Sequence, residues 1–119
     1  MKLLVQFPTY GRADKFLRVL TKYVETMGPH HDVFFNINCD LNDLTMTNPY
    51  VQERIKFILS KMPNVDGIVN YDEDTNKISA INDHVDQYEF DIVICASDDM
   101  VPKAWGWDNE IAIAMQEHF

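Results

Sequence analysis

Residues 90–102 read FDIVICASDDMVP, and the rest of the chain is best understood from this stretch. Its apolar part, residues 92–96, is short, uninterrupted and rich in β-branched side chains, which predicts a strand buried on both faces of a sheet. The apolar run stops at Ser97, Asp98 and Asp99. Adjacent carboxylates at the end of a buried strand are costly unless solvent, a cation or hydrogen-bond donors meet them. The stretch therefore predicts a polar site where this strand ends.

Composition limits the classes of protein to which the chain can belong. It has 119 residues, of which 46% are hydrophobic, a length and composition typical of one globular domain. The 19 acidic and 10 basic residues give a net charge of −9. This charge argues against binding to nucleic acid or to an anionic membrane surface, because both require clustered Lys and Arg. No apolar run approaches the roughly 20 residues that span a membrane.

The cysteines and the amino-terminal residues predict a reducing, cytoplasmic compartment. Cys39 and Cys95 fall inside predicted strands without a metal-binding or redox spacing, so we expect two buried, reduced thiols. The apolar residues after Met1 are too few for a signal peptide, and we expect a cytoplasmic protein. The chain stops at Phe119 inside a predicted amphipathic helix, which leaves both a natural end and a truncated domain open.

Strands and helices are predicted to alternate along the whole chain. Hydrophobic periodicity and turn residues predict strands at 3–7, 33–39, 65–70 and 92–96, and helices at 13–27, 49–62 and 78–88 and after residue 106. This order predicts an α/β fold with a mostly parallel, open sheet and helices on both faces. Because parallel strands end at one edge, the loops at 8–12, 40–47, 71–77 and 97–101 should share a rim where ligands bind.

The rim lacks the usual phosphate-binding loops, so a metal ion is the alternative means of holding phosphate. The chain has four glycines and neither a GxGxxG nor a GxxxxGK motif. Two carboxylates about 4 Å apart repel each other by roughly 4 kcal/mol at an effective dielectric constant near 20. A Mg²⁺ or Mn²⁺ ion between Asp98 and Asp99 would reverse that repulsion and bridge to a diphosphate. The alternative is that both aspartates are solvated or cap the following helix.

Four segments, in chain order, resemble motifs of the family 2 glycosyltransferases of the GT-A fold. FPTYGR at 7–12 resembles the P-T-Y-x-R opening, and Asp40 occupies the place of the family's uracil-contacting aspartate. KISAIN at 77–82 is similar to the K/G-x-x-A-x-N segment. ASDDMVP at 96–102 resembles the D-x-D-D-x-x-P region that binds a divalent cation and the nucleotide diphosphate.

The resemblance implies that residues 1–119 form one nucleotide-sugar-binding domain, the Rossmann-like half of a GT-A fold. It implies an inverting sugar transferase with a UDP- or GDP-type donor and Mn²⁺ or Mg²⁺ as cofactor. In that arrangement the aromatic ring of the opening motif would stack on the base, and the aspartate after the second strand would accept from a base N–H. The implied nucleotide-binding residues are Thr9, Tyr10, Arg12, Asp40, Lys77, Asn82, Ser97 and Asp98, and the implied metal ligands are Asp98 and Asp99.

Two departures from the family pattern leave other functions open. Ala96 stands where the family's metal motif has its first aspartate. The resemblance covers only the donor-binding half, so it identifies no catalytic base and no acceptor site. One alternative is a non-catalytic module that keeps the fold and binds a nucleotide or a partner. Another is a nucleotidyltransferase, although that class usually opens with a Gly-rich loop that this chain lacks.

Overall fold

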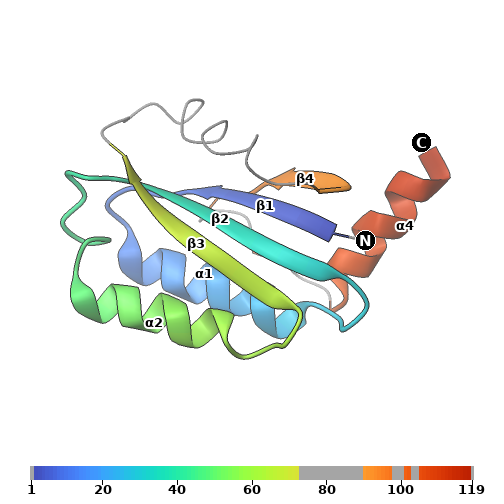
Figure 1. Ribbon diagram of the computed structural model, residues 1–119, viewed down its shortest axis with the longest axis horizontal. Helices are drawn as coiled ribbons and strands as arrows, with labels where there is room; N and C mark the ends of the chain where they lie inside the picture. The colour runs from blue at the N-terminus through green and yellow to red at the C-terminus, as the bar shows by residue number, and fades with distance from the viewer. Residues whose placement is uncertain (1, 73–89, 98–100, 103–104, 119) are drawn as a thin grey trace.

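The computed structural model describes residues 2–72, 90–97, 101–102 and 105–118 of the chain. Within these residues, four parallel strands form one sheet in the order β3-β2-β1-β4 (Figure 1). The strands are β1 (Lys2–Pro8), β2 (Asp32–Asp40), β3 (Val65–Asp72) and β4 (Ile92–Cys95). The helices are α1 (Ala13–Thr26), α2 (Pro49–Leu59) and α4 (Trp107–His118). The predicted α/β fold with a parallel sheet is confirmed, and the helix predicted at 78–88 lies outside the described residues.

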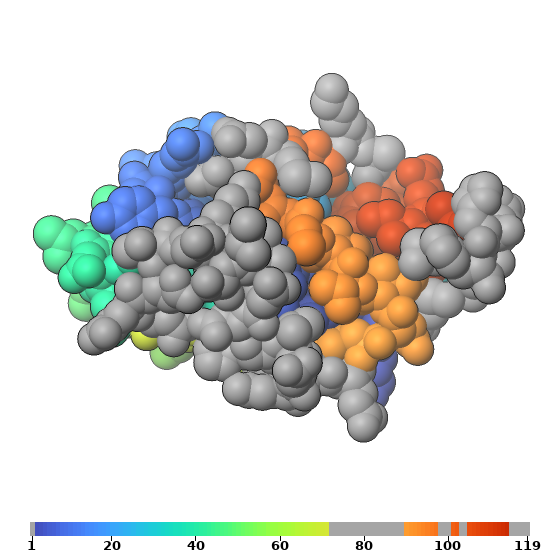
Figure 2. All heavy atoms as spheres, turned by 90° about the horizontal axis from the view of Figure 1, so that it is seen from above, coloured from blue at the N-terminus to red at the C-terminus, as the bar shows by residue number. Residues whose placement is uncertain are grey.

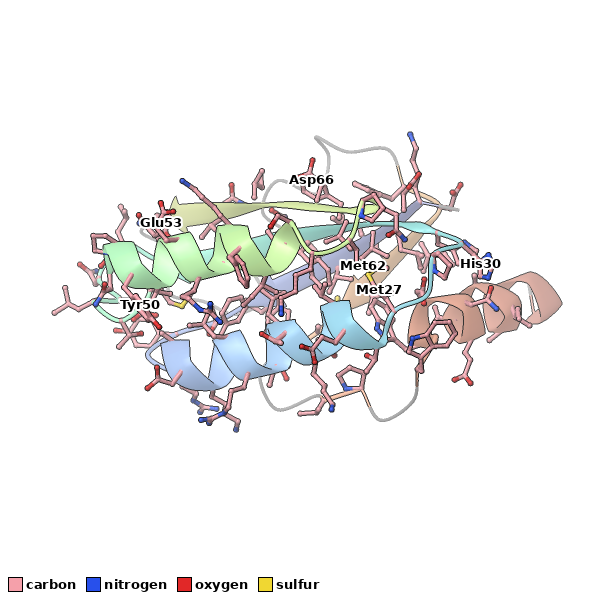
Figure 3. All side chains as sticks on the ribbon, turned by 90° about the horizontal axis from the view of Figure 1, so that it is seen from below. Met27, His30, Tyr50, Glu53, Met62 and Asp66 are labelled. Atoms are coloured by element: carbon pink, nitrogen blue, oxygen red, sulfur yellow. The ribbon has the colours of Figure 1, made fainter. Side chains whose placement is uncertain are left out.

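The apolar core lies between the sheet and the layer formed by α1 and α2 (Figures 1 and 3). Alternate residues of the two central strands face these helices and are almost completely buried, namely Leu3, Val5, Phe7, Val33, Phe35 and Ile37. The helices contribute the apolar positions that their periodicity predicts, among them Phe16, Leu20, Val24, Ile55 and Ile58. Phe7 and Phe16 meet edge to face with ring centroids 4.9 Å apart, which fixes α1 against β1.

The opposite face of the sheet carries a set of side-chain amides, which we call the amide ladder: the buried Gln6, Asn36 and Asn38 and the half-buried Asn70. Asn36 Nδ2 donates to Gln6 Oε1 at 2.7 Å, and Asn36 Oδ1 accepts from Asn70 Nδ2 at 2.6 Å. Asn70 Nδ2 also donates to Asn38 Oδ1 at 3.2 Å. The ladder joins β1, β2 and β3 on the face away from α1 and α2, so the two faces of the sheet are chemically different.

The prediction that β4 is buried on both faces is wrong. Ile92 is buried toward the helices, but Val93 is 49% exposed and Cys95 is exposed on the opposite face. Figure 2, viewed from that side, shows the segment that contains β4 (orange) at the surface. Among the described strands β4 has a neighbour only in β1, so its outer residues lack the cover that a central strand receives. Cys39 is a buried, reduced thiol as predicted, whereas Cys95 is exposed.

Hydrogen bonds and ring packing hold the start of α4 against the end of α1. The indole Nε1 of Trp107 donates to the carbonyl oxygen of Tyr23 at 2.8 Å, and the two rings pack edge to face. The backbone N–H of Gly28 donates to Asp108 Oδ1 at 2.8 Å. These contacts hold α4 beside the amino-terminal edge of the sheet, away from the predicted site (Figure 1).

Replacing Gly67 with alanine is expected to lower the free energy of unfolding by about 1–3 kcal/mol, the usual cost of overpacking a core. A Cβ atom at this position of β3 would lie 2.6 Å from the carbonyl oxygen of Phe35 and 3.0 Å from Leu59 Cδ1. The carbonyl belongs to the backbone of β2 and cannot move without shifting the strand. Urea unfolding measures the loss, and Asp66→Ala at the exposed neighbouring position is the control. Equal stability of both variants would show that the two strands can separate freely.

Candidate functional site

The predicted rim is the carboxyl-terminal edge of the sheet. Because β1, β2, β3 and β4 are parallel, the residues that follow them gather at one edge, at the left in Figure 1. The loop at 9–12 after β1 and the loop at 41–48 after β2 are neighbours there. Ala96 continues from β4 beside β1, with its N–H donating to the carbonyl oxygen of Gln6 at 2.9 Å. The fold thus brings together three of the predicted ligand-binding segments.

Asp43 ties the two central loops of the rim together. Its Oδ2 atom accepts from the backbone N–H of Gly11 at 2.7 Å, across the gap between the loops. Its Oδ1 atom accepts from Thr45 N at 3.0 Å, from Thr45 Oγ1 at 2.6 Å and from Met46 N at 3.3 Å. Gly11 has a φ of +69°, a backbone conformation that favours glycine. Asp43 therefore sets the path of the chain beside the predicted nucleotide-binding residues.

Sequence reasoning did not single out Asp43. The pattern of an aspartate followed two residues later by a threonine is typical of a local turn in which the carboxylate accepts backbone N–H groups. That pattern was visible in the sequence, but the bond to Gly11 depends on how two loops far apart in the chain come together. Of the apolar residues in this loop, Met46 is completely buried. Leu41 and Leu44 are 48% and 83% exposed.

Two buried polar atoms of the rim lack a hydrogen-bond partner among the described residues. They are Thr9 Oγ1 and Asp40 Oδ2, and their residues are only 8% and 3% exposed. The other carboxylate oxygen of Asp40 accepts from Asn42 N at 2.8 Å, and Thr9 N donates to the carbonyl oxygen of Asn38 at 3.0 Å. An unsatisfied buried polar group costs about 1–3 kcal/mol. Both residues are held in place while each keeps one polar atom available.

The remaining predicted site residues divide into described and undescribed positions. Tyr10 is 59% exposed beside Thr9, Arg12 is exposed immediately before α1, and Ser97 is half-buried after β4. Topology places all three on the same edge as Asp40. The predicted positions Lys77, Asn82, Asp98 and Asp99 lie outside the described residues. The described part of the chain contains no group of three His, Cys, Asp or Glu side chains that could hold a metal ion.

Tyr71, near the end of β3, also holds the loop after β2 in place. Its hydroxyl donates to the carbonyl oxygen of Met46 at 3.3 Å, which links β3 to the loop that contains Asp43. Burial raises the pKa of the Tyr71 phenol above its ordinary value, so the hydroxyl remains a neutral donor at physiological pH. The loop after β2 is therefore held from both sides, by Gly11 and by Tyr71.

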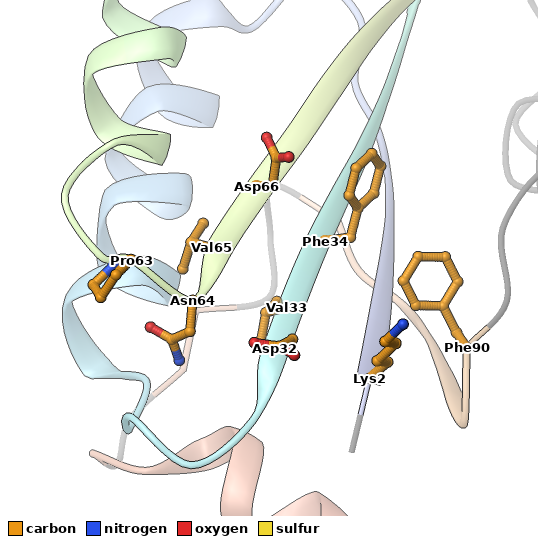
Figure 4. Close-up of a pocket in the computed structure, with 9 residues that line it drawn as sticks. All are labelled: Lys2, Asp32, Val33, Phe34, Pro63, Asn64, Val65, Asp66 and Phe90. Carbon is orange, nitrogen blue, oxygen red and sulfur yellow. The ribbon is translucent and has the colours of Figure 1, made fainter.

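Two of the cavities among the described residues are relevant here, one away from this rim and one beside it. One, of about 240 Å³, is at the opposite, amino-terminal edge of the sheet, where Lys2, Asp32, Phe34 and Phe90 are among its lining residues (Figure 4). The other, of about 580 Å³, lies between the first turns of α1 and α2 and adjoins the rim at Gly11. The first is distant from every predicted site residue that the structure describes. The second is lined in part by residues of the rim itself, among them Arg12 and Thr45.

Comparison of the chain with protein-family models, with curated proteins and with solved structures found no match. The functional assignment therefore depends on the residues of the rim themselves. Within the described part of the chain, the helices are too short or too polar to cross a membrane.

Proposed function

We propose that this chain is a GT-A-like domain that binds a nucleotide-diphosphate sugar at the carboxyl-terminal edge of its sheet. The observation that carries the proposal is the buried Asp40 carboxylate at the end of β2, with one oxygen fixed by Asn42 and the other unpaired among the described residues. Uracil and guanine both present a ring N–H that needs such an acceptor. The exposed ring of Tyr10 on the neighbouring loop is available to stack on the base.

The phosphate end of the ligand would lie toward β4. Ser97, Asp98 and Asp99 have only oxygen atoms to offer as ligands, which would suit the hard cations Mn²⁺ and Mg²⁺. Such an ion, when bound, neutralises part of the diphosphate charge. Arg12, exposed at the start of α1, supplies a further positive charge on the same edge. Cys39 and Cys95 are not joined in a disulfide, which supports our further proposal of a cytoplasmic location.

One observation favours the second candidate, a module that binds the nucleotide without transferring the sugar. Ala96, at the position of the family's first metal-binding aspartate, is only 3% exposed, and its N–H is bonded to β1. This position contributes no carboxylate to a metal site. Hydrolysis of a UDP-sugar by the purified chain would favour the transferase over the binding module.

Nucleotide binding is tested by following the melting temperature while UDP, GDP, ADP or CDP is added with and without Mn²⁺. A ligand at 100 times its dissociation constant adds about 2.7 kcal/mol of stability. We expect a shift with UDP or GDP and Mn²⁺, and at least about tenfold weaker binding by Asp40→Asn, which places an N–H donor against the base N–H. Asp66→Asn is the matched control on an exposed carboxylate.

A second variant separates the base site from the metal site. The double substitution Asp98→Ala with Asp99→Ala should remove the Mn²⁺ dependence and leave weak binding of uridine or guanosine intact. The proposal fails if no nucleotide raises the melting temperature. It also fails if the shift is the same in the wild type and in Asp40→Asn.

A further inference from the structure

The outer side of α2 exposes two large aromatic side chains. Tyr50 is 69% exposed and Phe57 is 54% exposed. They are seven residues apart, which is two turns of a helix, so they lie on one line about 10 Å apart along the axis. Figure 3 views the helix layer from the side away from the sheet, with Tyr50 and Glu53 labelled on α2. Large exposed apolar side chains that lie together indicate an interaction surface, whereas scattered ones do not.

Charges of opposite sign flank the two rings. On a helix of 3.6 residues per turn, Glu53 falls on one side of the line that joins the rings, and Arg54 falls on the other. Glu53 is 3.6 Å from Lys56, but this ion pair is highly exposed and such pairs contribute little. The Arg54 guanidinium lies 5.2 Å from the centroid of the Phe57 ring, and no carboxylate of the described residues pairs with it. We call Tyr50, Glu53, Arg54 and Phe57 the outer face of α2.

The outer face of α2 is complementary to itself under a twofold rotation. When two copies of α2 lie parallel, with the twofold axis between them, the rotation brings the Glu53 side of one helix to the Arg54 side of the other. Two Glu53–Arg54 pairs then form at once, one on each side of the contact between the aromatic rings. An antiparallel pair would instead place glutamate beside glutamate and arginine beside arginine, so the charges select the parallel arrangement.

This face is also where two copies of an acidic chain repel each other least. Residues 49–61 contain one acidic and three basic side chains, whereas the whole chain has 19 acidic and 10 basic ones. Two molecules of net charge −9 therefore approach more easily through α2 than through an average part of their surface. At physiological salt, the charges elsewhere on the two copies are screened beyond about 8 Å.

We infer that the outer face of α2 is the interface of a symmetric dimer of this chain, in which the two α2 helices pack in parallel. An aromatic centre with charged groups at its border is the usual composition of a protein–protein interface. Two pairs of rings and two ion pairs make a small interface, so the dissociation constant should be about 1–100 μM. None of the four residues belongs to the proposed nucleotide site.

The test is a charge exchange, with sedimentation equilibrium between about 1 μM and 1 mM as the measurement. Glu53→Arg places arginine against arginine on both sides of the interface, and Arg54→Glu places glutamate against glutamate. Each variant alone should raise the dissociation constant of the dimer about tenfold or more. An equimolar mixture of the two variants should form heterodimers, because each side of the interface again joins opposite charges. The double variant Glu53→Arg with Arg54→Glu should associate with itself.

Matched controls change the charge by the same amount away from the outer face. Asp66→Arg on β3 and Lys22→Glu on α1 should leave the dissociation constant within about twofold of the wild type. Tyr50→Ser and Phe57→Ser should each weaken the dimer, because they remove apolar area from its centre. Circular dichroism and thermal unfolding of every variant verify that α2 and the fold are intact.

Several results would overturn the inference. A wild-type chain that stays monomeric up to about 1 mM would leave the outer face to a partner other than a second copy. Equal dissociation constants for the wild type, Glu53→Arg and Arg54→Glu would place the dimer contact elsewhere. A mixture of these two variants that stays monomeric would refute the pairing across the twofold axis. Equal losses in the control variants would mean that only net charge matters.

Discussion

Replacing Asp43 with alanine is expected to lower the free energy of unfolding by about 2–4 kcal/mol, since a buried carboxylate and its hydrogen bonds are lost together. Four donors lose their acceptor at once: Gly11 N, Thr45 N, Thr45 Oγ1 and Met46 N. Asp43 itself is 2% exposed, so water does not already share these donors in the folded state. Urea unfolding measures the effect, and Asp66→Ala, which removes an exposed carboxylate, should cost less than about 0.5 kcal/mol.

Asp43→Asn distinguishes the hydrogen bonds that Asp43 accepts within its own loop from the bond that it accepts from Gly11. An amide oxygen in the place of Oδ1 keeps the bonds within the loop, while the amide nitrogen meets the N–H of Gly11, donor against donor. We expect a loss of about 1–2 kcal/mol, with the larger effect local to the loop after β1. Amide hydrogen exchange should become faster at Tyr10 and Gly11 and remain unchanged at Met46. Equal exchange at all three positions would refute the idea that Asp43 couples the two loops.

The fold could be predicted because the patterns that indicate its helices and strands each lie within a short stretch of sequence. The spacing of Phe16, Leu20 and Val24 predicts the buried side of α1, and Asn48-Pro49 predicts the start of α2. Both features are found in the structure. The alternation of strands and helices limited the sheet to parallel pairing, which placed Thr9 and Asp40 on one edge. These conclusions required only periodicity, turn residues and the handedness of crossovers.

The features that escaped prediction depend on strand order and loop packing. The apolar run at 92–96 cannot reveal from its own sequence that Val93 and Cys95 face outward, because exposure depends on which strands lie beside β4. Exposed Leu44 likewise resembles an anchor when read as sequence. The pattern Asn-Ile-Asn at 36–38 does show a polar side of β2, but its partners on β1 and β3 follow only from the register of the sheet. In each case the sequence does not show which residues become neighbours across the sheet or between loops.

The amide ladder leads to the second large prediction, which concerns Asn36. This side chain is fully buried, donates to Gln6 Oε1 and accepts from Asn70 Nδ2. Asn36→Asp keeps the shape but introduces a carboxyl group beside the side-chain amides of Gln6 and Asn70. A flip of the Gln6 amide would offer one hydrogen bond to the charged form, because Gln6 Nε2 has no partner among the described residues. It would not offer a counter-charge, so burial should raise the pKa of the new carboxyl group by about three units or more.

The sign of the pH dependence follows from this raised pKa. Below about pH 3 the group is protonated in both the folded and unfolded chains, and Asn36→Asp should be nearly as stable as the wild type. As the pH rises, the unfolded chain ionises first, and stability falls by up to about 1.4 kcal/mol per pH unit until the folded form also ionises. Three units correspond to a loss of about 4 kcal/mol near neutral pH, measured by urea unfolding across that pH range.

Two further variants distinguish the buried charge from the loss of the amide. Asn36→Ala removes the same hydrogen bonds without a titratable group, so its cost should be the same at every pH. Asn48→Asp makes the same chemical change at an exposed helix cap, where aspartate caps as well as asparagine, and stability should change by less than about 0.5 kcal/mol. If Asn36→Asp were equally destabilising at low and neutral pH, the carboxyl group would not be ionising in a buried environment. A pH-dependent loss confined to Asn36→Asp would instead establish that the sheet face away from α1 and α2 excludes water in solution.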